Sequence, residues 1–413
     1  MENVDVLIIG AGPAGSIAAS LIHQAGLKAR VVEKEKFPRF VIGESLLPRC
    51  MEVLEDAKFL DVLETRGFQK KFGAKFVLDE KVADYNFSDQ FTSGWKWTWQ
   101  VPRADFDTTL IDEVQRVGVP VQFERTVTDI QVLENENSVT TVVSKDGAEE
   151  KITARFIIDA SGYGRVIPRL FKLNKPAGLD PRKAVFAHVT DKKRNNFDEP
   201  NRIIIVSYAP GVWAWVIPFS NDTTSLGFVG SHEFFKSHSG SNSEQFEKLI
   251  NGNTYLKNRF ENCSRIFEPR ILESWSSSSS SFHGKGFVLT GNVTEFLDPI
   301  FSSGVMFATV SSQLATKLVI RKLNGESIDW KNEYEKVVND GVDTFRSYVV
   351  NWYDGTLEKI FYASNPDPLI KKQITSILGG YVWDLSNPYV REHQTILKKL
   401  ARKIEMRDAS NVQ

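Results

Sequence analysis

The sequence predicts an α/β fold, because a buried strand, a glycine turn with a helix, and a second strand follow one another at its start. Residues 4–9 are almost all apolar, as expected of a parallel strand that is covered on both faces. Residues 156–158 and 287–289 are two further apolar runs of this kind. Together these segments predict a Rossmann-like parallel sheet flanked by helices.

The turn after the first strand carries Gly10, Gly12 and Gly15, which match the pattern G-x-G-x-x-G. Gly10 allows the tight turn, Gly12 lets a pyrophosphate approach the backbone, and Gly15 lets the helix pack against the strand. A helix that begins near Pro13 and Ala14 directs its free N–H groups at that phosphate. The pattern favours a dinucleotide site over the alternative, a glycine turn that holds no ligand.

The second strand contains Val31 and Val32 and leads into Glu33. In dinucleotide-binding proteins an acid about twenty residues beyond the glycines accepts a hydrogen bond from the ribose. An acidic rather than a basic residue at this point favours an unphosphorylated ribose. Glu33 is therefore a predicted cofactor contact.

The composition is ordinary for a globular protein and excludes several classes of partner. A chain of 413 residues is long enough for two or three domains. Lys plus Arg (51) and Asp plus Glu (52) nearly cancel, so no broad field attracts nucleic acid or a membrane surface. No apolar run reaches the length of a membrane span, and no His/Cys spacing indicates a metal site. Cys50 and Cys263 are expected to be unpaired thiols in a reducing compartment, and we expect a cytoplasmic protein.

Residues 37–47 are interrupted by proline and glycine and are expected to form a loop, followed by one helix over residues 48–63. Gly43, Glu44 and Ser45 give this apolar loop an unusual polar centre. Ser45 as a helix cap is one interpretation, and backbone and hydroxyl contact with a cofactor is the other.

The same loop reads F-P-R-x-x-I-G-E-S-L-L-P from Phe37 to Pro48, and this segment resembles the flavin-dependent halogenases and their monooxygenase relatives. In those proteins the segment follows the FAD-binding βαβ unit. Five further stretches carry the resemblance, which spans roughly residues 1–325. It implies a p-hydroxybenzoate hydroxylase-like FAD-binding domain with an inserted antiparallel-sheet substrate domain.

The first of these stretches, residues 67–76, reads GFQKKFGAKF. In the halogenases a lysine just before an aromatic residue and Gly-Ala lies between flavin and substrate, and Lys71 matches it. An amine buried beside apolar walls loses proton affinity and can act as a nucleophile or as a hydrogen-bond donor to hypohalous acid. Because Lys70 and Lys75 flank Lys71, a solvated basic edge is the alternative.

Two more stretches concern the cofactor. Arg103 precedes an amphipathic helix, and the resemblance implies that it reaches FAD, although pairing with Asp105 or Asp107 is the alternative. A buried strand ends in the D-A-S-G turn from Asp159 to Gly162, which FAD-dependent hydroxylases place near the cofactor. A plain strand-to-helix turn would look similar.

The central part of the chain changes character. Residues 184–190, 202–208 and 224–230 alternate in the manner of an antiparallel sheet. Within it Trp213 and Trp215 belong to the halogenase motif W-x-W-x-I-P. Alternation places both indoles on one face of a strand, where they form either a wall for substrate or ordinary core.

The last matching stretch surrounds residues 291–304. FAD-binding relatives have Gly-Asp where this chain has Gly291 and Asn292, a departure that removes a charge and predicts a lower affinity for FAD. The small residues that follow in those relatives are replaced by Val293, Thr294 and Glu295, a bulkier and more acidic lining that predicts altered reactivity with oxygen. In halogenases the backbone N–H groups at Ser303 and Gly304 bind halide beside the flavin. Tryptophan halogenases have a glutamate where this chain has Phe301, which favours the phenol- or pyrrole-acting branch.

These patterns predict three parts. They are a discontinuous FAD-binding domain (1–73, 102–165 and 270–325), a substrate domain (74–101 and 166–269) and a helical C-terminal region (326–413) with a frayed end. The predicted catalytic residue is Lys71, the predicted substrate wall is Trp213 and Trp215, and the predicted cofactor contacts are Gly10, Gly12, Pro13, Ala14, Gly15, Glu33, Lys34, Arg39, Glu44, Ser45, Arg103, Asp159, Gly162, Gly291, Asn292, Pro299, Ser303 and Gly304.

The resemblance implies an FAD-dependent monooxygenase or halogenase that acts on an electron-rich aromatic or conjugated small molecule through a flavin peroxide, with chloride or bromide in the halogenase case. Because the chain has one glycine fingerprint, a separate flavin reductase or transiently bound NAD(P)H is expected to reduce FAD. Delivery of the substrate on a carrier protein stays open. The alternatives are a reductase of carbon–carbon double bonds, as in the geranylgeranyl reductases, which would act on a polyene, and a non-catalytic flavoprotein.

Overall fold

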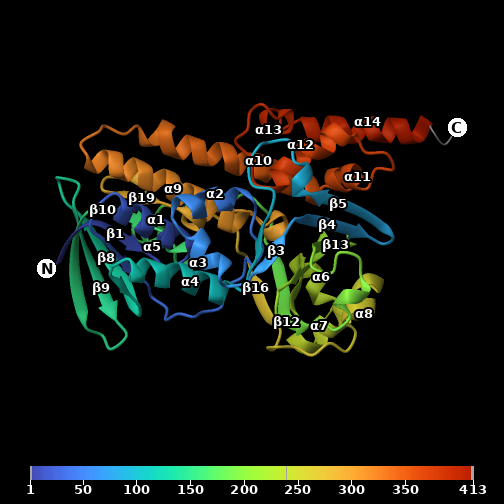
Figure 1. The fold of residues 1–413 in the computed structure, drawn as a ribbon, viewed down its shortest axis with the longest axis horizontal. Helices are drawn as coiled ribbons and strands as arrows, with labels where there is room; N and C mark the ends of the chain where they lie inside the picture. The colour runs from blue at the N-terminus through green and yellow to red at the C-terminus, as the bar shows by residue number, and fades with distance from the viewer. Residues whose placement is uncertain (1, 239, 411–413) are drawn as a thin grey trace.

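A parallel sheet forms one end of the molecule in the computed structural model, which describes residues 2–238 and 240–410 (Figure 1). Strand β1 (Glu2–Ile9) lies between β2 (Ala29–Val32) and β10 (Glu149–Asp159), and β10 pairs with β19 (Phe287–Leu289), all in parallel. Strands β7 (Val121–Gln122) and β18 (His283–Gly284) close the two edges. The predicted Rossmann-like sheet is confirmed.

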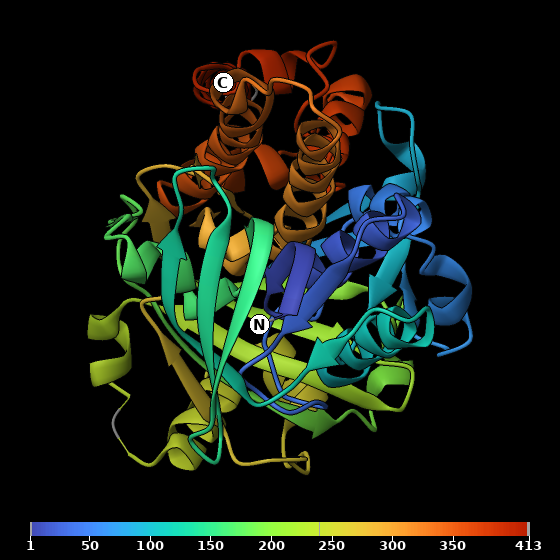
Figure 2. The same ribbon diagram turned by 90° about the vertical axis from the view of Figure 1, so that its left-hand side faces the viewer.

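Both faces of this sheet are covered, which explains its apolar strands. Helices α1 (Pro13–Gln24), α4 (Arg103–Arg116) and α9 (Ser303–Leu323) lie on one side, where Ser312 Oγ donates to the Ala14 carbonyl at 2.6 Å. On the other side β8 (Arg125–Val132) and β9 (Ser138–Ser144) continue from β10 as a meander (Figure 2).

The prediction of one helix over residues 48–63 is wrong, because the structure has two helices there. Helix α2 (Arg49–Asp56) and α3 (Leu60–Glu64) are separated by a turn in which Lys58 adopts a left-handed φ of 61°. The apolar spacing continues across the turn, so periodicity alone did not reveal the break.

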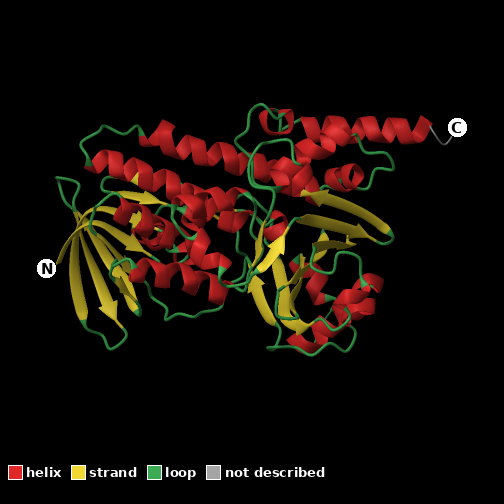
Figure 3. Ribbon diagram, viewed as in Figure 1, coloured by secondary structure: helices red, strands yellow, loops and turns green. Residues whose placement is uncertain are grey.

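A seven-stranded, mainly antiparallel sheet forms the other end of the molecule, as Figure 3 shows. Helices α6 (His232–Lys236), α7 (Asn242–Asn251) and α8 (Thr254–Phe260) cover its outer face. Its inner face, which carries Trp213 and Trp215, packs toward the parallel sheet and the C-terminal helices. The strands, in spatial order, are β16 (Arg270–Glu273), β12 (Lys183–Thr190), β15 (Thr223–Gly230), β14 (Val212–Pro218), β13 (Ile203–Ala209), β4 (Gly73–Leu78) and β5 (Lys81–Asn86).

The expected boundary at residue 270 differs from this arrangement, because β16 pairs with β12 in the second sheet. Two small sheets join the parts. Strand β3 (Gln69–Lys71) pairs with β6 (Thr98–Gln100), and β17 (Ser277–Ser279) lies between β11 (Asn174–Lys175) and β20 (Glu295–Phe296). Residues 276–281 are all serine, and this serine run, which contains β17, is an extended segment that leads back to the parallel sheet. The short helix α5 (Val166–Leu170) follows the turn after β10.

The C-terminal helices lie along both sheets at the top of Figure 1. They are α10 (Lys336–Tyr353), α11 (Thr356–Phe361), α12 (Pro368–Leu378), α13 (Pro388–Arg391) and α14 (Ile396–Ser410). The prediction of a frayed C-terminal end is wrong as far as Ser410, because the buried side chains of Leu397 and Ala401 hold α14 against the rest of the protein. Within the described residues, no helix is both long and apolar enough to cross a membrane.

Candidate functional site

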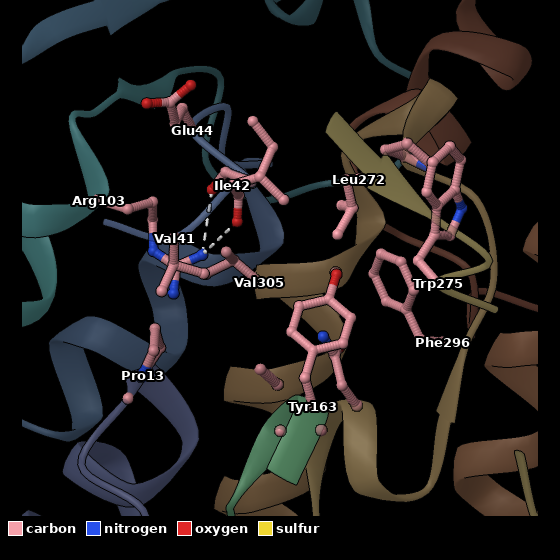
Figure 4. Close-up of a pocket in the computed structure, with 18 of the residues that line it drawn as sticks. Pro13, Val41, Ile42, Glu44, Arg103, Tyr163, Leu272, Trp275, Phe296 and Val305 are labelled. Atoms are coloured by element: carbon pink, nitrogen blue, oxygen red, sulfur yellow. Dashed lines mark hydrogen bonds between the residues drawn. The ribbon is translucent and has the colours of Figure 1, made fainter. Parts of the chain in front are cut away.

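A cavity of about 570 Å³ lies between the two sheets, and three turns from distant parts of the chain line it. They are the glycine turn at Gly12, the turn of residues 160–164 and the turn of residues 290–292. Figure 4 shows Pro13, Arg103 and Tyr163 around this space, with Phe296 and Trp275 at its far side. The cavity therefore sits at the carboxyl ends of β1, β10 and β19, where open α/β sheets bind ligands.

Most of the predicted contacts line the cavity, and a few do not. Gly10, Gly15, Asp159 and Ser303 lie outside the lining, and Lys71 lies in a second cavity described below. The predicted residues in the lining are Gly12, Pro13, Ala14, Glu33, Lys34, Arg39, Glu44, Ser45, Arg103, Gly162, Trp213, Trp215, Gly291, Asn292, Pro299 and Gly304.

The three glycines of the first turn have different surroundings. A Cβ on Gly10, whose φ is +102°, would lie 2.5 Å from the Ala160 carbonyl oxygen, and a Cβ on Gly15 would lie 1.9 Å from the Gly10 carbonyl oxygen. A Cβ on Gly12 would meet only the Arg39 guanidinium, at 3.5 Å. Gly10 and Gly15 are thus required by the fold, whereas Gly12 leaves open space on the cavity side.

Glu33 fastens the end of β2 to the glycine turn. One carboxylate oxygen accepts from the Ala11 N–H at 2.9 Å, and the other accepts from the Glu35 N–H at 2.8 Å. A carboxylate has further lone pairs beyond these two bonds. Glu33 can therefore hold the turn and still accept from a ribose hydroxyl in the cavity.

Arg103 and Arg39 both pair with the buried Asp107. Arg103 makes a two-pronged contact with that carboxylate at 2.8 and 2.9 Å, and its remaining nitrogen donates to the Ile42 and Gly43 carbonyls. Arg39 contacts Asp107 at 3.1 Å. Arg103 is thus paired with Asp107, as one of the two alternatives expected, and this ion pair holds the loop of residues 37–47 in place.

Two residues of that loop reach in opposite directions. Glu44 contacts His188 of β12 at 2.7 Å, which joins the loop to the second sheet. Ser45 accepts a hydrogen bond from Lys71 at 2.8 Å. His188 was not predicted, since a single histidine in a strand gives no sequence signal of its partner.

Asp159 supports its own turn instead of facing the cavity. Its two oxygens accept from the Ser161 N–H at 3.0 Å and the Ile167 N–H at 2.7 Å. Burial raises the pKa of this carboxyl, and the two backbone donors oppose that shift. The side chain therefore shapes the turn that presents Gly162 and Tyr163 to the cavity.

Arg165 joins the third turn to the serine run. It donates to the Ser278 carbonyl at 2.6 Å, to Ser279 Oγ at 2.8 Å and to the Asn292 carbonyl at 3.1 Å. Ser279 Oγ in turn donates to the Val293 carbonyl at 2.7 Å. The serines thus fix the turn that carries Asn292 at the cavity wall.

The two predicted tryptophans line the same cavity. Trp213 Nε1 donates to the Tyr353 hydroxyl and Trp215 Nε1 to Ser225 Oγ, both at 3.0 Å. Gly227 leaves room for the Trp215 ring, because a Cβ there would lie 2.2 Å from it. The indoles therefore form a fixed apolar wall.

Lys71 lies in a second, much smaller cavity of about 20 Å³. Ile203, Ile205 and Ser302 line both cavities and so separate them. The Lys71 side chain is 2 % exposed, and its amine donates to Ser45 Oγ and the Leu46 carbonyl, each at 2.8 Å. Because these partners are neutral, burial lowers the pKa of Lys71 to about 7.

The solvated-edge alternative fits Lys70, which is exposed over the Trp97 ring, but not Lys71. The rest of the small cavity is almost wholly apolar, with Phe87, Phe301 and Leu378 among its walls. A space of this size holds about one water molecule. An aromatic ring enters only when one of these side chains moves.

The turn that begins α9 lies at the junction of the two cavities. Pro299 and Gly304 line the large cavity, and Ser302, with a left-handed φ of 58°, lines both. Ser303 and Gly304 are the first residues of the long helix α9, whose free N–H groups and dipole favour an anion. The start of α9 at this junction is therefore suited to an anion.

This fold and cavity define an FAD-dependent oxidoreductase, and comparison with known proteins agrees. Residues 3–230 match the family model described as FAD binding domain, and the chain belongs to this family. It is 28% identical over 395 residues to a 1H-pyrrole-2-carbonyl-[peptidyl-carrier protein] brominase of Pseudoalteromonas luteoviolacea, covering 93% of each chain. It is 28% identical over 408 residues to the corresponding chlorinase of Pseudomonas fluorescens, covering 92% of this chain and 90% of that one.

Among solved structures, a flavoprotein/dehydrogenase from Cytophaga hutchinsonii superposes with a TM-score of 0.97 at 54% identity, covering 98% of this chain and all of that one. The predicted family, with its halogenase and monooxygenase members, is therefore confirmed, and the chain is an enzyme of this group. The brominase and the chlorinase do not favour the double-bond reductase alternative.

Replacement of Gly12 tests where the dinucleotide lies. Gly12 has a φ of −71°, which alanine adopts readily, and its Cβ would meet no backbone atom. Gly12→Ala should change the free energy of unfolding by less than about 0.5 kcal/mol. It should weaken FAD binding, followed by flavin fluorescence, by roughly tenfold or more because a phosphate can no longer approach.

Gly15→Ala is the matched control, since its Cβ would overlap the Gly10 carbonyl and the fold itself should suffer. Unchanged FAD affinity in a well-folded Gly12→Ala protein would contradict the placement of the pyrophosphate at Gly12.

Proposed function

We propose that this enzyme uses FAD, dioxygen and chloride or bromide to halogenate an electron-rich aromatic ring of the phenol or pyrrole type. One observation carries the proposal. The buried amine of Lys71 and residues 300–302, which lead into α9, line one small apolar cavity, and Ile203 and Ile205 separate it from the large cavity.

FAD supplies the redox chemistry when bound. After reduction by a separate flavin reductase or by transient NAD(P)H, it would supply two electrons and two protons, with which dioxygen, halide and one further proton give hypohalous acid and water. The turns that carry Gly12, Gly162 and Asn292 would hold its phosphates and ribityl chain, and Glu33 would hold its ribose. Ser303 and Gly304 would hold the halide.

The Lys71 amine then delivers the halogen. With a pKa of about 7, it is largely neutral at slightly alkaline pH, and Ser45 and Leu46 fix its position. Its nitrogen takes the halogen from hypohalous acid with loss of water, or its N–H donates to the acid's oxygen. In either case a ring carbon takes the halogen and gives up its proton.

The small apolar cavity supports this role because it excludes bulk water from a reagent that hydrolysis and side reactions would waste. Its walls include Phe76, Phe87 and Phe301. Phe301, where tryptophan halogenases carry a glutamate, supplies no acid or base, so the ring must be reactive by itself. Phenols and pyrroles meet that requirement.

The substrate is proposed to arrive as an aromatic acyl group on a carrier protein. The brominase and chlorinase that this chain matches over nine-tenths of their length are both named for a pyrrole carbonyl on a peptidyl-carrier protein. When the ring is tethered to a carrier protein, contacts with the carrier also provide binding energy outside the small cavity. This energy can offset the cost of moving Phe301 or Leu378.

Removal of the amine provides the central test. Lys71→Met should reduce halogen transfer to a phenol or a carrier-bound pyrrole at least about a hundredfold, a loss of roughly 3 kcal/mol in transition-state stabilisation. FAD binding and release of hypohalous acid into solution, captured by a thioether trap, should persist. Mass spectrometry of the product measures the transfer.

Lys70→Met is the matched control, since Lys70 is the exposed neighbour, and its activity should stay near that of the unaltered enzyme. Where Lys71 acts as nucleophile, the rate should rise with pH through about 7, because the amine loses its proton there. Equal halogen transfer by the Lys71→Met enzyme would refute the proposed role.

The size of the small cavity is tested by Phe301→Val. The ring packs against Tyr348 and Trp352, so its loss should cost roughly 2–3 kcal/mol of stability and leave a space that small aromatic molecules can fill. Phenol should then raise the melting temperature of the variant but not that of the unaltered protein. A variant that gains no affinity for phenol would place the substrate ring elsewhere.

A further inference from the structure

We infer that Tyr353 and Asp298 are positioning residues for the turn of residues 299–304, and that the Asp298 charge sets the affinity of this turn for halide. The inference rests on the proposed halide site and goes beyond it, since it assigns a function to the C-terminal helical region and to a carboxylate that no step above uses.

A continuous chain of hydrogen bonds connects Trp213, in the wall of the large cavity, with the turn that begins at Pro299. Trp213 Nε1 donates to the Tyr353 hydroxyl at 3.0 Å, and that hydroxyl donates to one Asp298 oxygen, also at 3.0 Å. The other Asp298 oxygen accepts from the Ile300 N–H at 3.1 Å. Each hydrogen-bonding atom of the Tyr353 hydroxyl and the Asp298 carboxylate thus has a partner.

The chain joins three separate parts of the molecule. Tyr353 ends α10 in the C-terminal region, Trp213 belongs to β14 of the second sheet, and Asp298 precedes the 3₁₀ turn Pro299–Phe301. Asp298 caps that turn through Ile300. A carboxylate that only capped the turn would not require Tyr353.

Tyr353 itself is held rigidly. The Arg182 guanidinium lies 3.7 Å from the centre of its ring, and Arg182 also donates to the Gly211 carbonyl at 3.0 Å. The hydrogen bond from Tyr353 therefore ties Asp298, at the head of the turn, to a side chain that Arg182 holds in place. Ser303 and Gly304 form the other end of the turn of residues 299–304 and begin α9.

The charge on Asp298 matters because the carboxyl is only 3 % exposed. Burial raises its pKa to about 6, although the Ile300 N–H and Tyr353 hydroxyl bonds and the Arg182 charge oppose the shift. Above that pH a negative charge sits beside the start of α9, and below it the charge is gone. Like charges repel, so halide binding should weaken as pH rises through about 6.

The experiment measures chloride and bromide dissociation constants for the FAD-loaded enzyme between pH 5 and 8, using the change in flavin absorbance. Between these limits the unaltered enzyme should lose roughly three- to thirtyfold in affinity, because a like charge then stands at the residue that begins the turn. Asp298→Asn keeps the shape and the acceptor of the side chain but cannot ionise. Its affinity should not show the step near pH 6.

Tyr353→Phe should weaken halide binding at every pH, because the turn loses its attachment while the ring still packs on Arg182. Tyr362→Phe is the matched control, since that hydroxyl contacts only Ser207, 3.4 Å away, in the described contacts. Lys71 titrates nearby with a pKa of about 7, so the series is repeated with Lys71→Met, which should keep the step near pH 6.

Linkage supplies a second readout without turnover. If ionisation of Asp298 lowers the affinity for halide, then halide binding must raise the pKa of Asp298 by the corresponding amount. Infrared spectra of the protonated carboxyl, absent in Asp298→Asn, should show this rise on addition of bromide.

Two failures are distinct. If the unaltered enzyme binds FAD but no halide at any pH, the proposed function fails and takes the inference with it. If halide binds and Asp298→Asn retains the full pH step, the inference alone is overturned.

Discussion

The register between β1, β10 and β19 is the constraint on which the rest of the structure depends. Ile9 pairs with Asp159 and Asp159 with Leu289, so the three strands end at one level. The Ala160 N–H donates to the Ile9 carbonyl at 2.8 Å, and the Thr290 N–H donates to the Asp159 carbonyl at 2.9 Å. Shifting any strand by one residue would separate the turns that form the cavity and reverse the faces of the strand.

Buried carboxylates maintain this arrangement, and each of them holds backbone or arginine instead of facing solvent. Glu33 bonds the first turn, Asp159 the second, and Asp107 the two arginines beside the loop of residues 37–47. Residues that a sequence motif presents as ligand contacts are thus also parts of the framework. A carboxylate accepts several hydrogen bonds at once, so the two roles are compatible.

The sequence predicted the elements whose pattern is local. Helix α1 and strands β1, β10 and β19 lie where periodicity and glycine placement put them. It did not predict the break at Lys58, because a single left-handed residue leaves the apolar spacing intact. Nor did it predict the pairing of β16 with β12, which depends on contacts between segments far apart in the chain.

The site followed the same division. Gly12, Asn292 and the two tryptophans could be placed in one cavity from motifs, since each motif carries its own backbone geometry. Burial of Lys71 could not be decided from its lysine neighbours, because strand alternation puts Lys70 on the opposite face, and only tertiary packing shows which face is covered. His188 gave no signal, because its role arises from a partner 144 residues away. Tyr353 belongs to a run of aromatic residues at helical spacing, a pattern that fits either core packing or closure of the site, and its bond to Asp298, 55 residues away, is visible only in the structure.

The separation of the two cavities constrains the chemistry further. Ile203, Ile205 and Ser302 stand between the flavin side and the amine side, so a flavin ring held among the turns would not touch a substrate held at Lys71. In the proposed halogenation, the species that passes between them would be small, since the space at Lys71 is about that of one water molecule. A direct transfer of hydride or oxygen from flavin to substrate requires contact between the two. Transfer of a small oxidised halide past Ser302 to the Lys71 amine does not require that contact.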